Sequence, residues 1–93
     1  MSSLRFEWDA PKAAANRRKH GVSFEEAASV FTDERARLID DPDHSQHEDR
    51  FLLLGLSSAL RVLVVAHCYL AEGNVIRIIS ARKATREERL YYP

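Results

Sequence analysis

The sequence predicts a small α+β domain in which helices flank a mainly antiparallel sheet. Apolar runs rich in Leu, Val and Ile, typical of strands, fill much of the second half of the chain. A short alternating segment near the start also has the period of a strand, and two capped helical segments follow it. A third capped segment comes after the last apolar run. The expected order is β-α-α-β-β-β-β-α, in a single domain over residues 1–93.

The first strand and helix are defined by local signals near the start of the chain. Residues 4–8 alternate apolar and polar side chains, as a half-buried strand does. Asp9 is suited to cap the following helix, Pro11 fits its first turn, and Gly21 supplies a left-handed stop. Trp8 ends the apolar strand, so we expect a supporting place in the core for it, and not a platform for stacked bases.

The second helix has a cap and an apolar stripe. Ser23 and Glu26 have the spacing of a capping box at its start. Its apolar residues recur at i, i+3, i+4 and i+7, which places them on one face of a helix. They are Phe24, Ala27, Ala28 and Phe31.

The remaining elements are four strands and a last helix. Residues 36–40 predict a short strand, and a turn-rich loop follows it. Three further strands are expected at residues 50–56, 61–69 and 75–81. Turn residues separate these three runs, which favours an antiparallel meander. Thr85 and Glu88 then form a capping box that opens a short helix.

The formal net charge is zero, but positive and negative residues are unevenly distributed along the chain. Residues 1–22 carry a net +3, residues 23–49 a net −7, and residues 50–93 a net +4. Eleven of the 14 basic residues are arginine, whose planar guanidinium suits phosphate. Two basic ends could therefore form one phosphate-binding face while the acidic centre faces a partner. The alternative is three ordinary solvated surfaces.

Several classes of protein are excluded or disfavoured. No apolar run is long enough to cross a membrane, and the first five residues lead to no signal-like core, so no membrane partner is expected. The single cysteine, Cys68, cannot form an internal disulfide, which favours a cytoplasmic location. His44 and His47, or His67 beside Cys68, lack the spacing of a zinc site. We expect no metal and no other cofactor.

Two blocks of residues, taken together, form a pattern that is specific for one protein family. The first block consists of Phe6, Trp8, Asp9, Lys12, Asn16, Lys19, His20, Gly21 and Phe24. The second consists of Glu48 and Arg50, then Gly55, the run from Arg77 to Ala84 (Arg-Ile-Ile-Ser-Ala-Arg-Lys-Ala), and Glu88 with Arg89. In this order and spacing, over about residues 6–91, the chain resembles the BrnT family of bacterial toxins.

The resemblance implies a fold, an activity and a partner. Members of the BrnT family look like RelE-type ribonucleases, which inhibit translation by cleaving RNA. A small ribbon-helix-helix antitoxin, BrnA, neutralises them, and the complex represses its own promoter, so DNA is contacted only through the complex. An alternative from a different class is a non-catalytic module that binds nucleic acid or protein and acts as a co-repressor.

Metal-independent RNA cleavage needs a base for the 2′-hydroxyl, an acid for the leaving 5′-oxygen, and cations beside the phosphate. The catalytic candidates are Arg77, Arg82, Lys83, His20, Lys19 and His67. The candidates for RNA binding are Lys12, Asn16, Arg50, Arg86 and Tyr91. Tyr91 is included because the resemblance implies a tyrosine near the C-terminus, where RelE-type enzymes often have one for stacking or acid–base chemistry. Glu48, Trp8 and Asp9 are expected to support them. Glu48 and Arg50 could also act as base and phosphate clamp.

Each group of candidates has a structural alternative. Arg77 and Arg82 differ in strand parity, so a bend after Ser80 is needed to bring both to one site. Arg77 could instead form a structural ion pair with an acid such as Glu48. A lone strand histidine such as His67 is often a hydrogen-bonded core residue.

The first helix offers a further choice. Lys12, Asn16, Lys19 and His20 are spaced to share one face, which we interpret as RNA-binding. The alternative for Lys19 and His20 is compensation of the negative end of the helix dipole.

Overall fold

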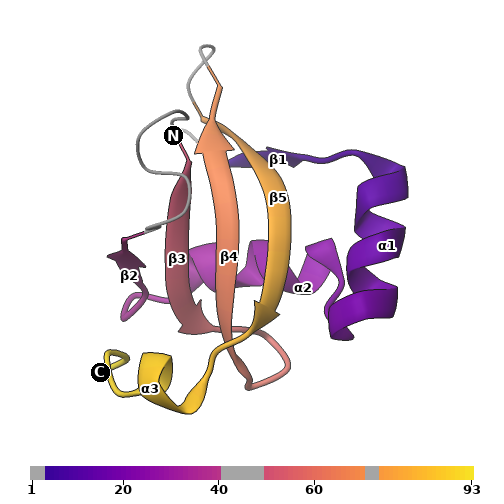
Figure 1. Ribbon diagram of the computed structural model, residues 1–93. Coiled ribbons are helices and arrows are strands. Elements are labelled where there is room, and N and C mark those ends of the chain that lie inside the picture. Colours follow the sequence, from indigo (N-terminus) through magenta and orange to yellow (C-terminus); the bar gives the residue numbers. More distant parts are fainter. Residues whose placement is uncertain (1–3, 41–49, 71–73) are drawn as a thin grey trace.

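The computed structural model describes residues 4–40, 50–70 and 74–93, which form a five-stranded sheet with one helix across one face and another beside one edge (Figure 1). The strands are β1 (Arg5–Glu7), β2 (Arg37–Ile39), β3 (Phe51–Leu56), β4 (Val62–Tyr69) and β5 (Val75–Lys83). The helices are α1 (Ala10–His20), α2 (Phe24–Ser29) and α3 (Arg86–Arg89), and a 3₁₀ turn, Val30–Thr32, extends α2. No helix within these three ranges is long and apolar enough to cross a membrane.

The sheet combines a meander with one strand from the start of the chain. Its spatial order is β1-β5-β4-β3-β2, and β2 through β5 pair in antiparallel fashion. β1 lies parallel to β5 and covers only the first part of that edge, from Val75 to Arg77. The predicted class, α+β with a mainly antiparallel sheet, is confirmed.

The core lies between the sheet and α2. We call this side the helix face of the sheet, and the other side the open face. Leu53, Leu63, Val65 and Ile78 from the strands pack with residues of α2 and its surroundings. Those residues are Val22, Phe24, Ala27 and Val30. The predicted stripe of the second helix therefore does face the core, with Phe24 and Ala27 fully buried.

The helix ends follow the local signals in the sequence. Asp9 caps α1 by accepting from the backbone N–H of Lys12 at 3.0 Å, and Gly21 ends the helix at φ 69°. Thr85 and Glu88 form both hydrogen bonds of a capping box at α3. At α2, Ser23 caps the helix, but the carboxylate of Glu26 bonds elsewhere.

Gly55 is required where β3 meets the turn after α2. A Cβ at this position would lie 2.8 Å from Val30 Cγ1 and 2.9 Å from Ala36 Cβ. The missing side chain lets the 3₁₀ turn and the chain before β2 approach the sheet closely. Asp33, in the same segment, accepts a hydrogen bond from the backbone N–H of Leu56 at 2.8 Å. The tyrosine hydroxyl of Tyr92 donates to the same carboxylate at 2.7 Å.

Candidate functional site

A bulge in β5 places Arg77 and Arg82 on the same face of the sheet. Arg77 pairs with Cys68 of β4 and Arg82 pairs with Val64, four residues apart and therefore on one face. This is possible because the register shifts between the two pairs, leaving Ile79 without a partner in β4. The irregularity that the two arginines require thus lies at Ile79 and not after Ser80, and both arginines lie on the open face. Their backbones are about 13 Å apart along the strand.

Arg77 forms an ion pair with Glu7 of the neighbouring β1. The guanidinium Nη1 lies 2.5 Å from Glu7 Oε1, and both side chains are 43% exposed. The structural alternative for Arg77 is thus present, with Glu7 as the acid. Glu48, the acid considered from the sequence, lies outside the described residues.

Arg82 binds Glu88 through two parallel hydrogen bonds. Its Nη1 and Nη2 lie 2.7 Å and 2.9 Å from the two carboxylate oxygens of Glu88. The hydrogen bonds from Arg82, helped by the backbone N–H of Thr85, lower the pKa of Glu88 to about 2 against the effect of burial. This bidentate pair fixes the guanidinium and ties α3 to the end of β5.

The end of α1 lies beside the end of β5, and this region is called the α1–β5 corner. The carbonyl of Gly21 accepts from Arg61 Nη2 at 3.1 Å, and Arg61 directly precedes β4. Lys83 pairs with Leu63 at the same end of the sheet. Lys19 is exposed and His20 is half-buried here. The structure therefore brings the ends of the elements that carry these residues, α1 with Lys19 and His20 and β5 with Arg82 and Lys83, to one corner.

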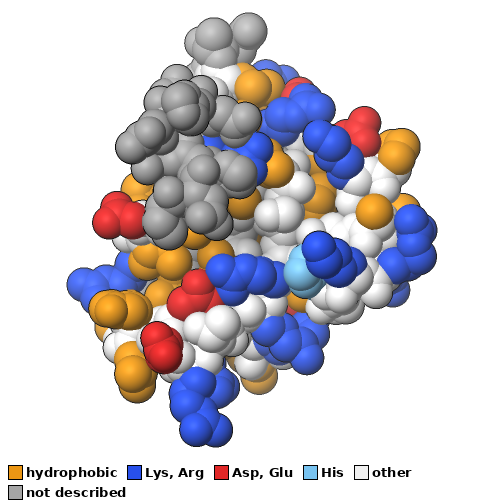
Figure 2. Space-filling view, viewed as in Figure 1, with side chains coloured by type: hydrophobic (Ala, Val, Ile, Leu, Met, Phe, Trp, Pro, Cys, Tyr) orange, Lys and Arg blue, Asp and Glu red, His pale blue; other side chains and the backbone are white. Residues whose placement is uncertain are grey.

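Basic side chains are numerous on the open face. Figure 2, viewed as Figure 1, shows Lys and Arg side chains across the lower half and the right side of this face. By strand alternation Arg82 points toward this face and Lys83 toward the opposite one, at the same end of β5.

His67 lies on the helix face and is fully buried. Its ring packs at right angles against Phe31, with centroids 4.8 Å apart, and against Tyr69, and it packs at a tilt against Phe51. Nδ1 lies 3.1 Å from the carbonyl of Val65, and Nε2 lies 3.3 Å from the Tyr69 hydroxyl. Burial lowers the pKa of His67, although the bond to Val65 opposes this. These contacts favour the alternative of a hydrogen-bonded core histidine.

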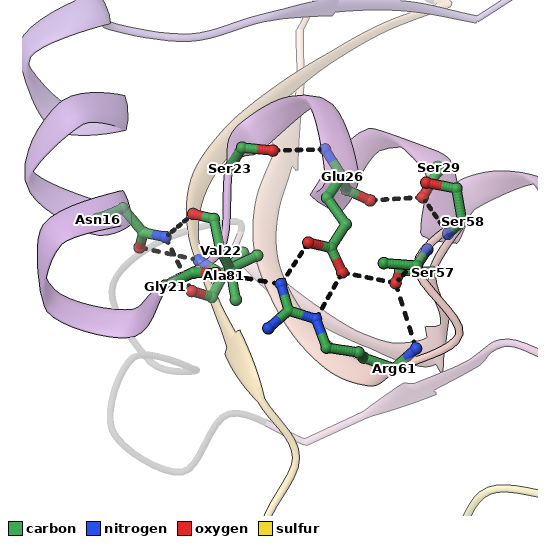
Figure 3. Close-up of polar contacts among 11 residues, drawn as sticks. Asn16, Gly21, Val22, Ser23, Glu26, Ser29, Ser57, Ser58, Arg61 and Ala81 are labelled. Carbon is green, nitrogen blue, oxygen red and sulfur yellow. Dashed lines mark hydrogen bonds and ion pairs between the residues drawn. The ribbon is translucent and has the colours of Figure 1, made fainter.

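Asn16 does not lie on an exposed face of α1, which corrects the expected RNA-binding face. It is 8% exposed, and its Nδ2 donates to the carbonyls of Val22 and Ala81 at 3.0 and 2.9 Å. Its Oδ1 accepts from the backbone N–H of Ala81 at 3.1 Å. Beyond the part of β5 that β1 covers, the Asn16 amide thus satisfies backbone groups on the strand edge (Figure 3).

The other candidates are spread over the molecule. Lys12 on α1 and Arg86 on α3 are exposed, and Tyr91 is 64% exposed beside a depression of about 470 Å³. Arg50 is half-buried before β3, at the end of the sheet that also holds Arg77. Of the supporting residues within the described ranges, Asp9 caps α1 as predicted, and Trp8 packs edge-on against Phe24 at 5.9 Å.

No pattern in the sequence indicated the network around Glu26 and Arg61. The two side chains form an ion pair, and Arg61 Nε donates to Glu26 Oε2 at 3.0 Å. The hydroxyl of Ser57 donates to the same oxygen at 2.6 Å, and the network joins α2 to the turn between β3 and β4 (Figure 3). Arg61 lowers the pKa of Glu26, although burial opposes the shift. Because 35 positions separate the pair, no local spacing could have revealed it.

Metal ligands do not gather in the part of the chain that the structure describes: no group of three or more His, Cys, Asp or Glu side chains is placed to hold an ion there. His44 and His47 lie outside it.

Comparisons with known proteins identify the family. The model of the family described as "Ribonuclease toxin, BrnT, of type II toxin-antitoxin system" matches residues 8–88. A crystal structure of the Brucella abortus ribonuclease toxin BrnT is similar, with 22% sequence identity and a TM-score of 0.69. The similarity covers 90% of this chain and 100% of that chain, and it shows a shared fold. No curated protein matches the sequence. The family model spans most of the chain, which therefore belongs to the BrnT family of ribonuclease toxins of type II toxin–antitoxin systems.

Proposed function

We propose that this protein is a metal-independent endoribonuclease that inhibits translation by cleaving RNA. The membership of a family of ribonuclease toxins supports the activity. We further propose a RelE-type relationship for the fold, as the resemblance of the sequence suggests.

The observation that carries the proposal is the alignment of Arg77 and Arg82 by the bulge in β5. Without the extra residue Ile79, strand alternation would direct the two guanidinium groups to opposite sides of the sheet. Guanidinium groups stay protonated and bind two phosphate oxygens at once. A row of two arginines along the open face suits an RNA backbone, with Arg82 beside the α1–β5 corner.

The chemistry that we propose needs only side chains and the RNA itself. The 2′-hydroxyl loses its proton to a base and its oxygen attacks the adjacent phosphorus. The bond from phosphorus to the 5′-oxygen then breaks, and that oxygen takes a proton from an acid. The products are a 2′,3′-cyclic phosphate and a 5′-hydroxyl.

Roles at the α1–β5 corner follow from exposure and charge. His20, half-buried at the end of α1, is the residue that we propose for proton transfer. Lys19 and Arg82 supply positive charge for the phosphorane-like transition state, and Lys83, directed to the opposite side of β5, contributes to binding of the RNA chain. His67 is left out because it is fully buried, and Asn16 because its amide already holds α1 to β5.

The antitoxin is the expected protein partner, because the family acts in type II toxin–antitoxin systems. We propose a ribbon-helix-helix protein of the BrnA kind, with DNA bound only through the complex. The acidic centre of the sequence, much of which lies outside the described residues, is the segment proposed to meet basic parts of this antitoxin.

A second function is favoured by the ion pairs of the two arginines. Glu7 and Glu88 already neutralise Arg77 and Arg82, as they would in a purely structural arrangement. A non-catalytic module that acts with the antitoxin as a co-repressor would need these ion pairs only to stabilise its fold.

The test is direct. Purified protein is incubated with a defined RNA in EDTA, and the ends of the products are identified. We expect fragments that carry 2′,3′-cyclic phosphate and 5′-hydroxyl ends. Intact RNA at an excess of freshly purified protein would reject the enzyme and favour the co-repressor. The matched variants are Arg82→Gln, which should reduce cleavage strongly, and Arg35→Gln, which removes an exposed charge between α2 and β2 and should not.

A further inference from the structure

A second basic site lies next to the α1–β5 corner, in a depression of about 450 Å³. We propose that this depression binds a stretch of the RNA chain beside the cleaved bond, so it rests on the proposed function. It is lined by Leu60, Arg61, Val62, Lys83, Ala84 and Arg89. The turn before β4, the end of β5 and α3 all contribute to it.

Three cations from three different elements line the depression. They are Arg61, Lys83 and Arg89, and none of the lining residues carries a carboxylate. Arg61 donates hydrogen bonds to Glu26 and to the carbonyl of Gly21, so it lines the site and is not the residue that we propose to contact phosphate. Lys83 and Arg89 are exposed and supply the charges that would contact phosphate.

The floor of the depression is held rigid. The backbone N–H of Ala84 donates to the carbonyl of Val62 at 2.9 Å, which joins the end of β5 to the start of β4. The Glu26–Arg61 ion pair fixes the same region from the other side. The two cations are thus carried on a framework that does not need to form when RNA binds.

Leu60 is an exposed apolar residue held in an unfavourable backbone conformation. Its φ is 62°, in the left-handed region that usually takes glycine, and the residue is 78% exposed. It sits in the tight turn closed by the bond from Ser57 N–H to the carbonyl of Arg61 at 2.8 Å. A leucine here stabilises neither the turn nor the core. Its place at the rim of a basic depression fits contact with a base or ribose.

The depression lies where an RNA strand bound at the α1–β5 corner would continue. The bond from Arg61 to Gly21 connects the wall of the depression with the end of α1, which carries Lys19 and His20. Lys83 belongs to both regions. An RNA strand at the corner would therefore pass into the depression, where successive phosphates meet Lys83 and Arg89.

The experiment measures binding separately from cleavage. A single-stranded RNA with 2′-O-methyl groups at every position has no nucleophile, so its affinity is measured by fluorescence anisotropy at several salt concentrations. We expect Arg89→Gln and Lys83→Gln each to weaken binding about fivefold and to reduce the salt slope by about 0.7. The control Arg35→Gln, a loss of the same charge elsewhere, should change neither value. Unchanged affinity and slope in both depression variants would overturn the site.

Leu60→Gly gives a second, independent readout. Glycine removes the backbone strain, so the variant should melt at a higher temperature while binding the methylated RNA more weakly. A more stable variant with unchanged affinity would overturn the role of Leu60. The binding experiment and the cleavage experiment can fail independently. If Arg89→Gln and Lys83→Gln weaken binding but the wild type leaves unmodified RNA intact in EDTA, the proposed cleavage is wrong and the proposed RNA-binding depression is kept.

Discussion

The side chain of Asn16 binds both backbone groups of Ala81, 65 positions later in the chain. It donates to the carbonyl at 2.9 Å and accepts from the N–H at 3.1 Å. In this way a helix side chain takes the place of a neighbouring strand where the edge of β5 extends beyond β1. The contact sets the position of α1, and therefore of Lys19 and His20, relative to the end of the sheet.

Replacing Asn16 should destabilise the fold. Asn16→Ala leaves the backbone groups of Ala81 and the carbonyl of Val22 without these partners in a buried place. We expect a loss of about 3 kcal/mol in the free energy of unfolding, measured by urea denaturation. Arg18→Ala, an exposed change on the same helix, should cost less than about 0.5 kcal/mol. Equal stability of the two variants would mean that the amide does not hold α1 in place.

Gly55 should tolerate no side chain. In Gly55→Ala the new methyl group must displace Val30 or Ala36, which lie within 3 Å of its ideal position. We expect a loss of about 2 kcal/mol in the free energy of unfolding. Gly21→Ala provides the comparison, since it meets open space and suffers only from its positive φ, at about 1 kcal/mol. The close approach of Val30 and Ala36 to Gly55 is disproved if the two variants unfold at the same denaturant concentration, or if Gly21→Ala unfolds at the lower concentration.

The Arg82–Glu88 pair should make stability depend on acid pH. The pKa of Glu88 is lowered from 4.5 to about 2 in the folded protein, so its contribution is complete above about pH 4.5. It is lost as the pH falls from that value toward 2, because the unfolded chain then binds the proton more readily. Unfolding of the wild type and of Glu88→Gln is compared from pH 7 to pH 2.5. We expect the wild type to be the more stable at pH 7 and the difference to shrink below pH 4.5. A constant difference would contradict the assignment.

A proton-transfer role for His20 predicts a change in the pH dependence of cleavage. If His20 transfers the proton, its removal takes away a general acid or base, so His20→Ala should remove one limb of the profile of kcat/KM against pH. We also expect the rate at the optimum to fall on the order of 10²–10⁴-fold. Arg35→Gln serves as the control and should keep the wild-type profile. A slower variant whose profile has the same shape as the wild type would assign His20 to positioning or binding.

Local signals in the sequence predicted local structure well. Asp9, Gly21, Ser23 and the Thr85–Glu88 box act within one helical turn, so their spacing alone contains the information. The apolar runs likewise placed the strands of the meander, because burial on a sheet follows the alternation of side chains.

The features that the sequence did not predict depend on contacts between residues far apart in the chain. Strand parity alone separates Arg77 from Arg82, and only the pairing with β4 reveals that Ile79 is an extra residue. Helical spacing grouped Asn16 with Lys12 and Lys19, because α1 has no apolar stripe to mark its buried side. The partner of that side, Ala81, is on another strand. The ion pair of Glu26 with Arg61 was missed for the same reason.

We propose that the protein cleaves RNA through the 2′-hydroxyl of its substrate without a metal. The most direct measurement compares an RNA with one preferred cleavage position and the same RNA carrying a single 2′-deoxy nucleotide there, both in EDTA. We expect cleavage at that bond in the first RNA and none in the second, with equal binding of the two. Cleavage of the deoxy-substituted bond, or no cleavage of either RNA, would contradict the claim.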